Sequence, residues 1–446
     1  MAEQADVVIA GARCAGSAAA AALARRGCKV IAVDPARFPS TTVSTHLLFA
    51  SGVAELARAG ALERVEKIGA PKLSRAFVGG PGHAASGRYT PIDGIDYGMC
   101  VRRTALDAAL VDTARAAGAE VREGHRVVDL LWEGGRAVGV KVSERGGREY
   151  EVRANLVIGA DGRRSTVARL VGAEQPRISH ANGRACYYAY YEDPREEWRT
   201  TAAMWLTGQE LGNAFPCDGG LSMVLLMPPA ARAADFRGDL ETEFHRTVGL
   251  VPGLAKRLEG CTRATKIVSS AVHPSFFRTS AGPGWALVGD AGHFKDPVTA
   301  QGIRDAVRFG RLLGERVADV VDDPAALDQA TRAWERSRDA QCLIMYHWTN
   351  LLGRGDGLAY VQIELLRGLT DGPDGVRRIL EVYSRIRDPR ETLAMSGMVK
   401  AVARALRDNP GARLSVLKAT GETLREMAGH HDEAKRLLRP AMSASA

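Results

Sequence analysis

The first 34 residues constrain the fold of this chain more than any other segment. Residues 5–10 form a short apolar run rich in β-branched side chains, and residues 29–33 form a second one. The turn at residues 11–16 has glycine at both ends, and the alanine-rich residues 17–26 that follow it favour a helix. Strand, glycine turn, helix and strand in this order predict a βαβ unit with a parallel sheet.

The glycine turn has the composition of a dinucleotide-binding turn. Small residues let the backbone approach a pyrophosphate, and the next helix points its positive end at the negative charge. Arg13 stands where the middle glycine is usual, and Asp34 follows the last glycine by 18 residues, near the distance of an acid that binds ribose hydroxyls. The predicted cofactor-binding residues of this unit are Gly11, Arg13, Cys14, Ala15, Gly16 and Asp34.

Two alternatives stay open for this unit. An ordinary α/β unit also needs glycine in a tight turn, with no cofactor present. Arg13 either contacts a phosphate or is a solvated side chain.

The composition is that of a globular chain without a nucleic-acid partner. Hydrophobic residues make up 46% of the 446 positions and charged residues 25%, and this length suggests two or three domains. The net charge is +8, but the basic residues are spread along the chain, whereas a nucleic-acid surface needs clustered charge. No apolar run reaches about 18 residues, and we expect no signal peptide at the N-terminus. We expect a cytoplasmic protein with no membrane partner.

The seven cysteines indicate neither a metal site nor a redox pair. No two of them have CxxC spacing, and their odd number and scatter are typical of reduced, buried thiols. We expect no bound metal.

Three later motifs favour FAD over a nicotinamide dinucleotide as the bound cofactor. Residues 157–169 resemble the DG motif of the flavin-dependent aromatic hydroxylases, the family of para-hydroxybenzoate hydroxylase. Residues 289–302 resemble the GD motif of that family, and residues 103–106 are similar to its arginine segment near the pyrophosphate. Together with the glycine turn, these motifs follow the family's order.

The resemblance implies how FAD is held. The GD aspartate would bind the ribityl chain, and the start of the next helix would offer N–H groups to the pyrimidine edge of the ring, where negative charge develops on reduction. One departure is Ala300, where the family has the first glycine before that helix. The residues assigned to the cofactor in this way are Arg103, Asp161, Gly162, Gly289, Asp290, Gln301, Gly302 and Ile303.

The candidate catalytic residues are Asp296, Pro297 and His46. Asp296 stands where the family has proline, and we hypothesise that it is a base or an orienting group for a substrate hydroxyl. The alternatives are that it caps the turn before Pro297 or pairs with Lys295 or Arg304. His46 either bonds flavin or substrate or is a satisfied structural histidine.

The predicted fold is α/β, with a Rossmann-type FAD-binding domain, an inserted mixed β-sheet substrate domain and a helical C-terminal region. The FAD-binding domain is expected at 1–172 and 281–325, the substrate domain at 173–280 and the helical region at 326–446. Residues 70–100 belong either to the first or to the second of these.

The resemblance implies an FAD-dependent, NAD(P)H-using monooxygenase. Dioxygen would add to the reduced flavin, and the flavin hydroperoxide would hydroxylate a small electron-rich substrate, either an aromatic or a polyketide-like molecule. The alternative is an FAD-dependent oxidoreductase that reduces or desaturates a double bond without inserting oxygen.

Overall fold

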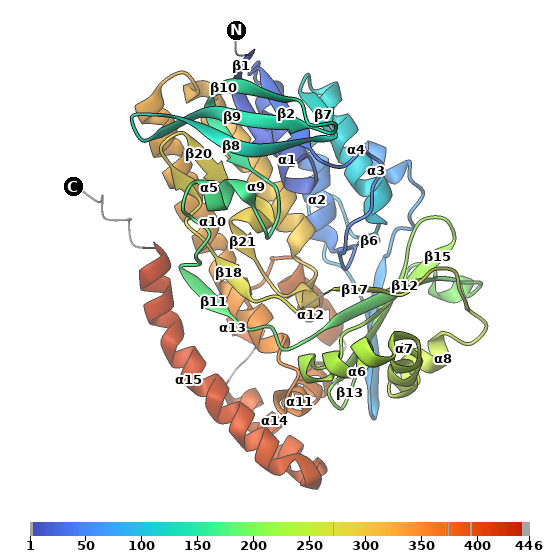
Figure 1. The fold of residues 1–446 in the computed structure, drawn as a ribbon. Helices are drawn as coiled ribbons and strands as arrows, with labels where there is room; N and C mark the ends of the chain where they lie inside the picture. Colours follow the sequence, from blue (N-terminus) through green and yellow to red (C-terminus); the bar gives the residue numbers. More distant parts are fainter. Residues whose placement is uncertain (1–2, 271, 371, 373, 393–394, 439–446) are drawn as a thin grey trace.

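The computed structural model describes residues 3–438 except 271, 371, 373 and 393–394. This part of the chain folds into two large β-sheets and a group of C-terminal helices (Figure 1). The predicted α/β class, with a Rossmann-type unit, a second mixed sheet and a helical C-terminal region, is confirmed.

The first sheet is built around five parallel strands. β1 (Glu3–Ala10) lies between β10 (Glu149–Gly159) and β2 (Val30–Asp34). β7 (Glu120–Glu123) extends the sheet beyond β2, and β20 (Trp285–Leu287) extends it beyond β10. The central strands read as continuous apolar runs because they are covered on both faces.

Antiparallel strands complete this sheet. The hairpin of β8 (His125–Glu133) and β9 (Arg136–Glu144) pairs with the first half of β10. β19 (Ala281–Gly282) pairs with β20 at the other edge. β20 ends at Leu287, and residues 289–291 of the GD motif form a 3-10 turn.

Small residues let two helices approach closely beside the parallel strands. α1 (Cys14–Ala24) packs against α9 (Gly302–Val317), and also against α4 (Arg103–Ala116). A Cβ on Gly310 would lie 2.3 Å from the carbonyl oxygen of Ala15. This close approach holds the start of α9 beside the glycine turn.

A buried carboxylate ties α9 to α2 (Ala50–Arg58). Glu55 is fully buried and accepts bonds from Arg308 at 2.7 Å, Arg311 at 3.0 Å and Arg58 at 2.6 Å. The ion pairs offset the cost of burying the charge and fix α9 relative to α2.

The second sheet is mixed and contains two strands from early in the chain. β4 (Arg75–Gly80) and β5 (His83–Arg88) form a hairpin, and β4 pairs in parallel with β13 (Thr201–Thr207). The remaining strands are antiparallel to their neighbours: β12 (Cys186–Glu192), β14 (Glu210–Pro216), β15 (Leu221–Leu226), β16 (Thr262–Arg263) and β17 (Val268–Ser270).

Three helices cover one face of the second sheet. Phe236 and Phe244 from these helices pack on Trp205 and Tyr187 of the sheet in one apolar cluster. The helices are α6 (Ala233–Gly238), α7 (Leu240–Gly249) and α8 (Pro252–Arg257).

Short elements connect the two sheets. They are α3 (Leu62–Glu66), α5 (Thr166–Leu170), the strand pair β3 (Leu47–Leu48) and β6 (Met99–Cys100), and a small sheet of β11 (Ile178–His180), β18 (Ser275–Phe277) and β21 (His293–Phe294).

The C-terminal region is helical, as expected. Figure 1 shows α15 along the outside of the molecule, in red. None of the described helices is long and apolar enough to cross a membrane. The helices of this region are α10 (Pro324–Leu352), α11 (Leu358–Thr370), α12 (Gly375–Tyr383), α13 (Pro389–Thr392), α14 (Met395–Asp408) and α15 (Arg413–Leu438).

Candidate cofactor and active site

A cavity of about 630 Å³ lies at the carboxyl ends of β1, β2 and β10. Ligands of open α/β sheets bind at this edge, because loops diverge there and helix N-termini face the opening. The predicted site residues that line the cavity are Gly11, Arg13, Cys14, Ala15, Asp34, Arg103, Asp161, Gly162, Gly289, Asp290, Pro297, Gly302 and Ile303. Gly16, His46, Asp296 and Gln301 lie outside the lining.

The glycine turn is shaped by two close backbone approaches. Gly11 has φ 99°, the left-handed region that favours glycine, and its N–H donates to the carbonyl oxygen of Val33 at 2.8 Å. A Cβ on Gly16 would lie 1.8 Å from the carbonyl oxygen of Gly11. Gly16 therefore acts through packing, because it allows α1 to start directly beneath the turn.

Asp34 holds the turn from the neighbouring strand. Its carboxylate accepts the backbone N–H groups of Ala12 and Ala36, both at 2.8 Å. Burial raises the pKa of Asp34, and the two N–H donors oppose that rise. The residue thus links the ends of β1 and β2 at the cavity wall.

We expect Asp34→Ala to weaken FAD binding by about 1.5–3 kcal/mol, which is roughly 10–150-fold in Kd, because a charged hydrogen-bond acceptor is lost from the cavity wall. Fluorescence titration of the apoprotein with FAD measures the change. Asp6→Ala is the matched control, since Asp6 accepts the N–H of Lys29 at the opposite end of the same strands. Unchanged affinity in Asp34→Ala would remove Asp34 from the site.

Arg13 and Arg103 converge on a buried acid that the sequence analysis missed. Asp107 accepts Nη1 of Arg13 at 2.5 Å and Nη2 of Arg103 at 2.8 Å. Cys14 donates to the same carboxylate at 3.4 Å, and burial raises the pKa of this thiol to about 12, so it stays protonated. The spacing of four residues between Arg103 and Asp107 on one helix was the available signal.

The structure therefore gives Arg13 a third role. Its guanidinium forms hydrogen bonds within the protein, because Asp107 and the Ser40 hydroxyl, the latter at 2.9 Å, both accept from it. It still lines the cavity, at the end where the glycine turn lies.

We expect Arg13→Ala to weaken FAD binding by only about 0.3–1 kcal/mol, because the guanidinium is partly exposed and already paired. The loss should shrink as salt rises, since screening weakens the wild-type contact. Kd values measured between low and high salt test this, and parallel salt curves for both proteins would mark Arg13 as incidental.

The two motif acids have different environments. Asp161 is satisfied within the protein, because it accepts the Ser165 hydroxyl at 2.5 Å and the Thr166 N–H at 2.7 Å and so anchors the start of α5. Asp290 has no hydrogen-bond partner among the described residues and lines the cavity. Burial raises the pKa of Asp290, and the positive charge of Arg163 opposes the rise most strongly.

This arrangement fits FAD. The free Asp290 carboxylate can accept the hydroxyls of a polyol chain, and Arg13 and Arg103, which line the same cavity, suit a pyrophosphate. The tight turn between them leaves the backbone open to close approach.

The start of α9 forms another wall. Ala300 has φ 49°, so it adopts the left-handed conformation for which a glycine is usual at this place. Gly302 and Ile303 line the cavity. The Gln301 side chain points elsewhere, since it donates to Tyr383 and accepts from Arg385.

A buried charge network lies behind this wall and was not predicted. Lys295 donates to Asp305 at 2.5 Å and lies 3.3 Å from Nε2 of His293. The side-chain atoms of His293, Asp305 and Cys342 that could bind a metal ion lie within 4.8 Å of one another. The Lys295 ammonium, however, already contacts His293 and Asp305. The protein itself thus supplies the cation of this cluster.

His46 is buried among protein partners. Nδ1 lies 2.7 Å from the Ser44 carbonyl oxygen, and Nε2 lies 2.8 Å from the Tyr190 hydroxyl. Burial lowers the pKa of His46 to about 4, so the ring is neutral and Nε2 accepts. Tyr188 packs edge-on against the same ring, so both tyrosines lie on one face of β12. His46 fixes the end of the 42–45 segment that lines the cavity.

Asp296 caps the turn before Pro297 and keeps one oxygen free. Oδ1 accepts the Val298 N–H at 2.9 Å, whereas Oδ2 is buried without a described hydrogen-bond partner. Burial raises the pKa of Asp296 to about 7. The alternative pairing with Lys295 or Arg304 is wrong, because both of these bond to Asp305.

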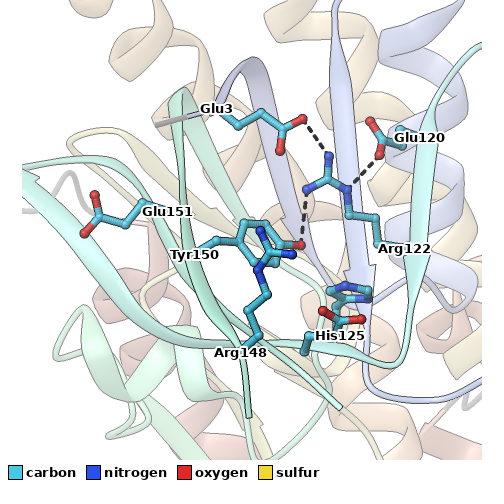
Figure 2. A pocket seen from close by; sticks show the side chains of 8 residues that line it. Glu3, Glu120, Arg122, His125, Arg148, Tyr150 and Glu151 are labelled. Carbon is cyan, nitrogen blue, oxygen red and sulfur yellow. Dashed lines mark hydrogen bonds and ion pairs between the residues drawn. The ribbon is translucent and has the colours of Figure 1, made fainter. Parts of the chain in front are cut away.

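A second hollow, of about 720 Å³, lies at the opposite edge of the first sheet. Glu3 and Glu120 stand at the starts of β1 and β7 and line it. Figure 2 shows Arg122 bonded to both of them and to Tyr150, at 2.6, 2.7 and 3.1 Å. This hollow lies away from the strand ends at which such sheets bind ligands.

Comparison with known proteins gives the following similarities. A family profile described as "FAD binding domain" matches residues 4–209. The chain is 30% identical over 333 residues to menaquinone reductase of Mycolicibacterium smegmatis, covering 70% of this chain and 76% of the relative. It is 26% identical over 322 residues to digeranylgeranylglycerophospholipid reductase 2 of Methanococcoides burtonii, covering 71% and 75%.

Solved structures share the fold. The flavin-dependent brominase Bmp2 superposes with a TM-score of 0.74 at 18% identity, over 91% of this chain and 100% of the other. PqsL of Pseudomonas aeruginosa, described as a probable FAD-dependent monooxygenase, has a TM-score of 0.66 at 18% identity, over 79% and 96%.

Proposed function

This chain belongs to the family of FAD-binding flavoprotein oxidoreductases, and we propose that it reduces a carbon–carbon double bond in an isoprenoid substrate. The observation that carries the proposal is the similarity, over about three quarters of their length, to two proteins named as reductases. Geranylgeranyl groups and menaquinone both contain isoprenoid chains. The brominase and monooxygenase similarities are below 25% identity and concern the fold.

The cofactor of this reaction would be FAD in the cavity at the carboxyl edge of the first sheet. When bound, FAD supplies hydride transfer, with NAD(P)H as the proposed reductant. Asp290 would bind its polyol chain, and Arg103 and Asp34 would hold the other half. The start of α9, at Gly302, would stabilise negative charge at its wall through the positive end of a 16-residue helix.

Reduction of a double bond adds a hydride to one carbon and a proton to the other. Asp296 is our proposed proton donor, because its Oδ2 is buried without a described partner and its pKa, raised by burial to about 7, keeps much of it protonated near neutral pH. Its neighbours Lys295 and Pro297 line the cavity. Arg184, which also lines the cavity, is close enough to oppose the rise in the pKa of Asp296.

The wall opposite the first sheet is backed by an apolar cluster. Cys186 of β12 lines the cavity, and Tyr188 follows on the same face of that strand. Behind them lies one continuous apolar cluster that includes Phe215, Met223 and Leu225.

The second candidate function is hydroxylation of an aromatic or polyketide-like substrate with dioxygen. The order of the glycine turn and the DG and GD motifs favours it, as does the fold shared with a probable FAD-dependent monooxygenase.

An oxygen-free assay separates the two functions. The FAD-loaded protein would be incubated under argon with NAD(P)H and a menaquinone that has a short isoprenoid chain. After any quinol has been reoxidised in air, we expect a product that retains two additional hydrogen atoms in its isoprenoid chain. Turnover only in the presence of dioxygen, with a product that gains one oxygen atom, would support the monooxygenase instead.

A further inference from the structure

We propose that α15 docks this protein on the surface of an anionic lipid bilayer, in place of the expectation of no membrane partner. The proposal rests on the proposed function only for the reason to dock, which is that isoprenoid lipid substrates reside in membranes. The surface itself is argued from the side chains of α15.

One flank of α15 exposes large apolar side chains. Leu414 is 85% exposed, Leu417 53%, Leu424 54% and Met427 46%. Spacings of three and seven residues place them along one side of the helix. The side that faces the protein is separate, and there Val416 and other small residues are buried in the contact with α11 and α14. We call Leu414, Leu417, Leu424 and Met427 the apolar flank.

The charges beside the apolar flank are basic. Lys418 and Arg425 form no ion pair among the described residues. The acids of the same part of the helix lie on the side away from the apolar flank, where Glu422 and Glu426 bond to Arg354 at 2.7 and 3.2 Å and share it with Asp356. Exposed leucines beside unpaired cations are complementary to an anionic lipid surface, where acyl chains take the apolar groups and headgroups take the cations.

A second copy of the chain fits this flank less well. Pairing of two helices needs apolar side chains at alternating spacings of three and four residues. Leu414, Leu417 and Leu424 begin such a pattern, but its other positions hold Gly421, Ala428 and His431. Glycine and alanine leave the seam of a helix pair unfilled.

The same helix connects inward to the cavity. The side chain of Arg354 pairs with Glu422 of α15. Its backbone carbonyl oxygen accepts a hydrogen bond from Nη2 of Arg184 at 3.3 Å. Arg184 lines the cavity, so a single residue separates α15 from the cavity wall. A bilayer bound at α15 would therefore lie on the side of the molecule to which Arg184 and Arg354 belong.

Vesicle flotation tests the proposal. The FAD-loaded protein is mixed with vesicles of phosphatidylglycerol and phosphatidylcholine, or of phosphatidylcholine alone. We expect binding to the anionic vesicles that weakens as salt rises. The triple variant Leu414→Ser, Leu417→Ser, Leu424→Ser should bind about 100-fold more weakly, since three apolar side chains no longer enter the bilayer. Lys418→Gln with Arg425→Gln should weaken binding about fivefold for each charge.

The control is Leu250→Ser, which removes a leucine 41% exposed at the end of α7, remote from α15 in sequence, and should bind like wild type. No binding of the wild-type protein to anionic vesicles, or equal binding by the triple variant, would overturn the proposal. So would a dimer by light scattering that the triple variant abolishes. Reduction of a short-chain substrate in detergent should be unchanged in the triple variant, so a missing activity in wild type counts against the proposed function and not against docking.

Discussion

The Gly16→Val protein should be purified without yellow colour, with its affinity for FAD lowered about 100-fold or more. The physical reason is the 1.8 Å between the Cβ position of Gly16 and the carbonyl oxygen of Gly11. A side chain there must push α1 away from the turn, and the turn backbone then no longer lies where a pyrophosphate can approach it. Titration of apoprotein with FAD and the visible spectrum measure the effect.

Gly27→Ala is the matched control at the other end of α1. Gly27 has φ 86°, but no atom lies within 4 Å of its Cβ position. This variant should lose roughly 1 kcal/mol of stability through backbone strain and keep its FAD. If Gly16→Val binds FAD as the wild type does, the glycine turn is not the cofactor site.

The Asp296→Asn variant should keep FAD but lose about 10²–10⁴-fold in the rate of substrate reduction. Asparagine keeps the size of the side chain and an acceptor for the Val298 N–H, but it has no acidic proton to deliver. Stopped-flow measurement of the oxidation of the reduced protein by substrate gives this rate directly. Full reduction rates in Asp296→Asn would exclude Asp296 as the donor.

The pH dependence of the same step gives a second readout. A donor must be protonated, and the pKa of Asp296 is raised by burial to about 7. The wild-type rate should therefore be constant below about pH 7 and fall about tenfold for each further pH unit, whereas the Asn variant should show no such fall.

The sequence predicted the parts of the site that depend on neighbouring residues. The strand, glycine turn and helix at residues 5–26 are specified by local apolar runs, glycine and alanine, and β1 and α1 appear there. The start of α9 at Gly302 was likewise expected from the motif before it. In each case the residues that decide the conformation are adjacent in the chain.

The sequence could not predict contacts that tertiary packing creates. Asp107 meets Arg13 from a helix 94 residues away, and no local pattern specifies that pair. The parallel pairing of β4 with β13 depends on two distant segments that share a sheet. The sequence left open whether His46 is a structural histidine. The structure decides this, because the hydroxyl of Tyr190, 144 residues further along the chain, bonds to Nε2 of His46.

The isotopic composition of the product tests the central claim most directly. Parallel reactions with a short-chain isoprenoid quinone would be run in D₂O and under ¹⁸O₂, and the products analysed by mass spectrometry. If the protein reduces a double bond with a proton from an exchangeable acid, the product from D₂O carries deuterium bound to carbon and the product from ¹⁸O₂ carries no label. A product that contains one ¹⁸O atom and no carbon-bound deuterium would contradict the account.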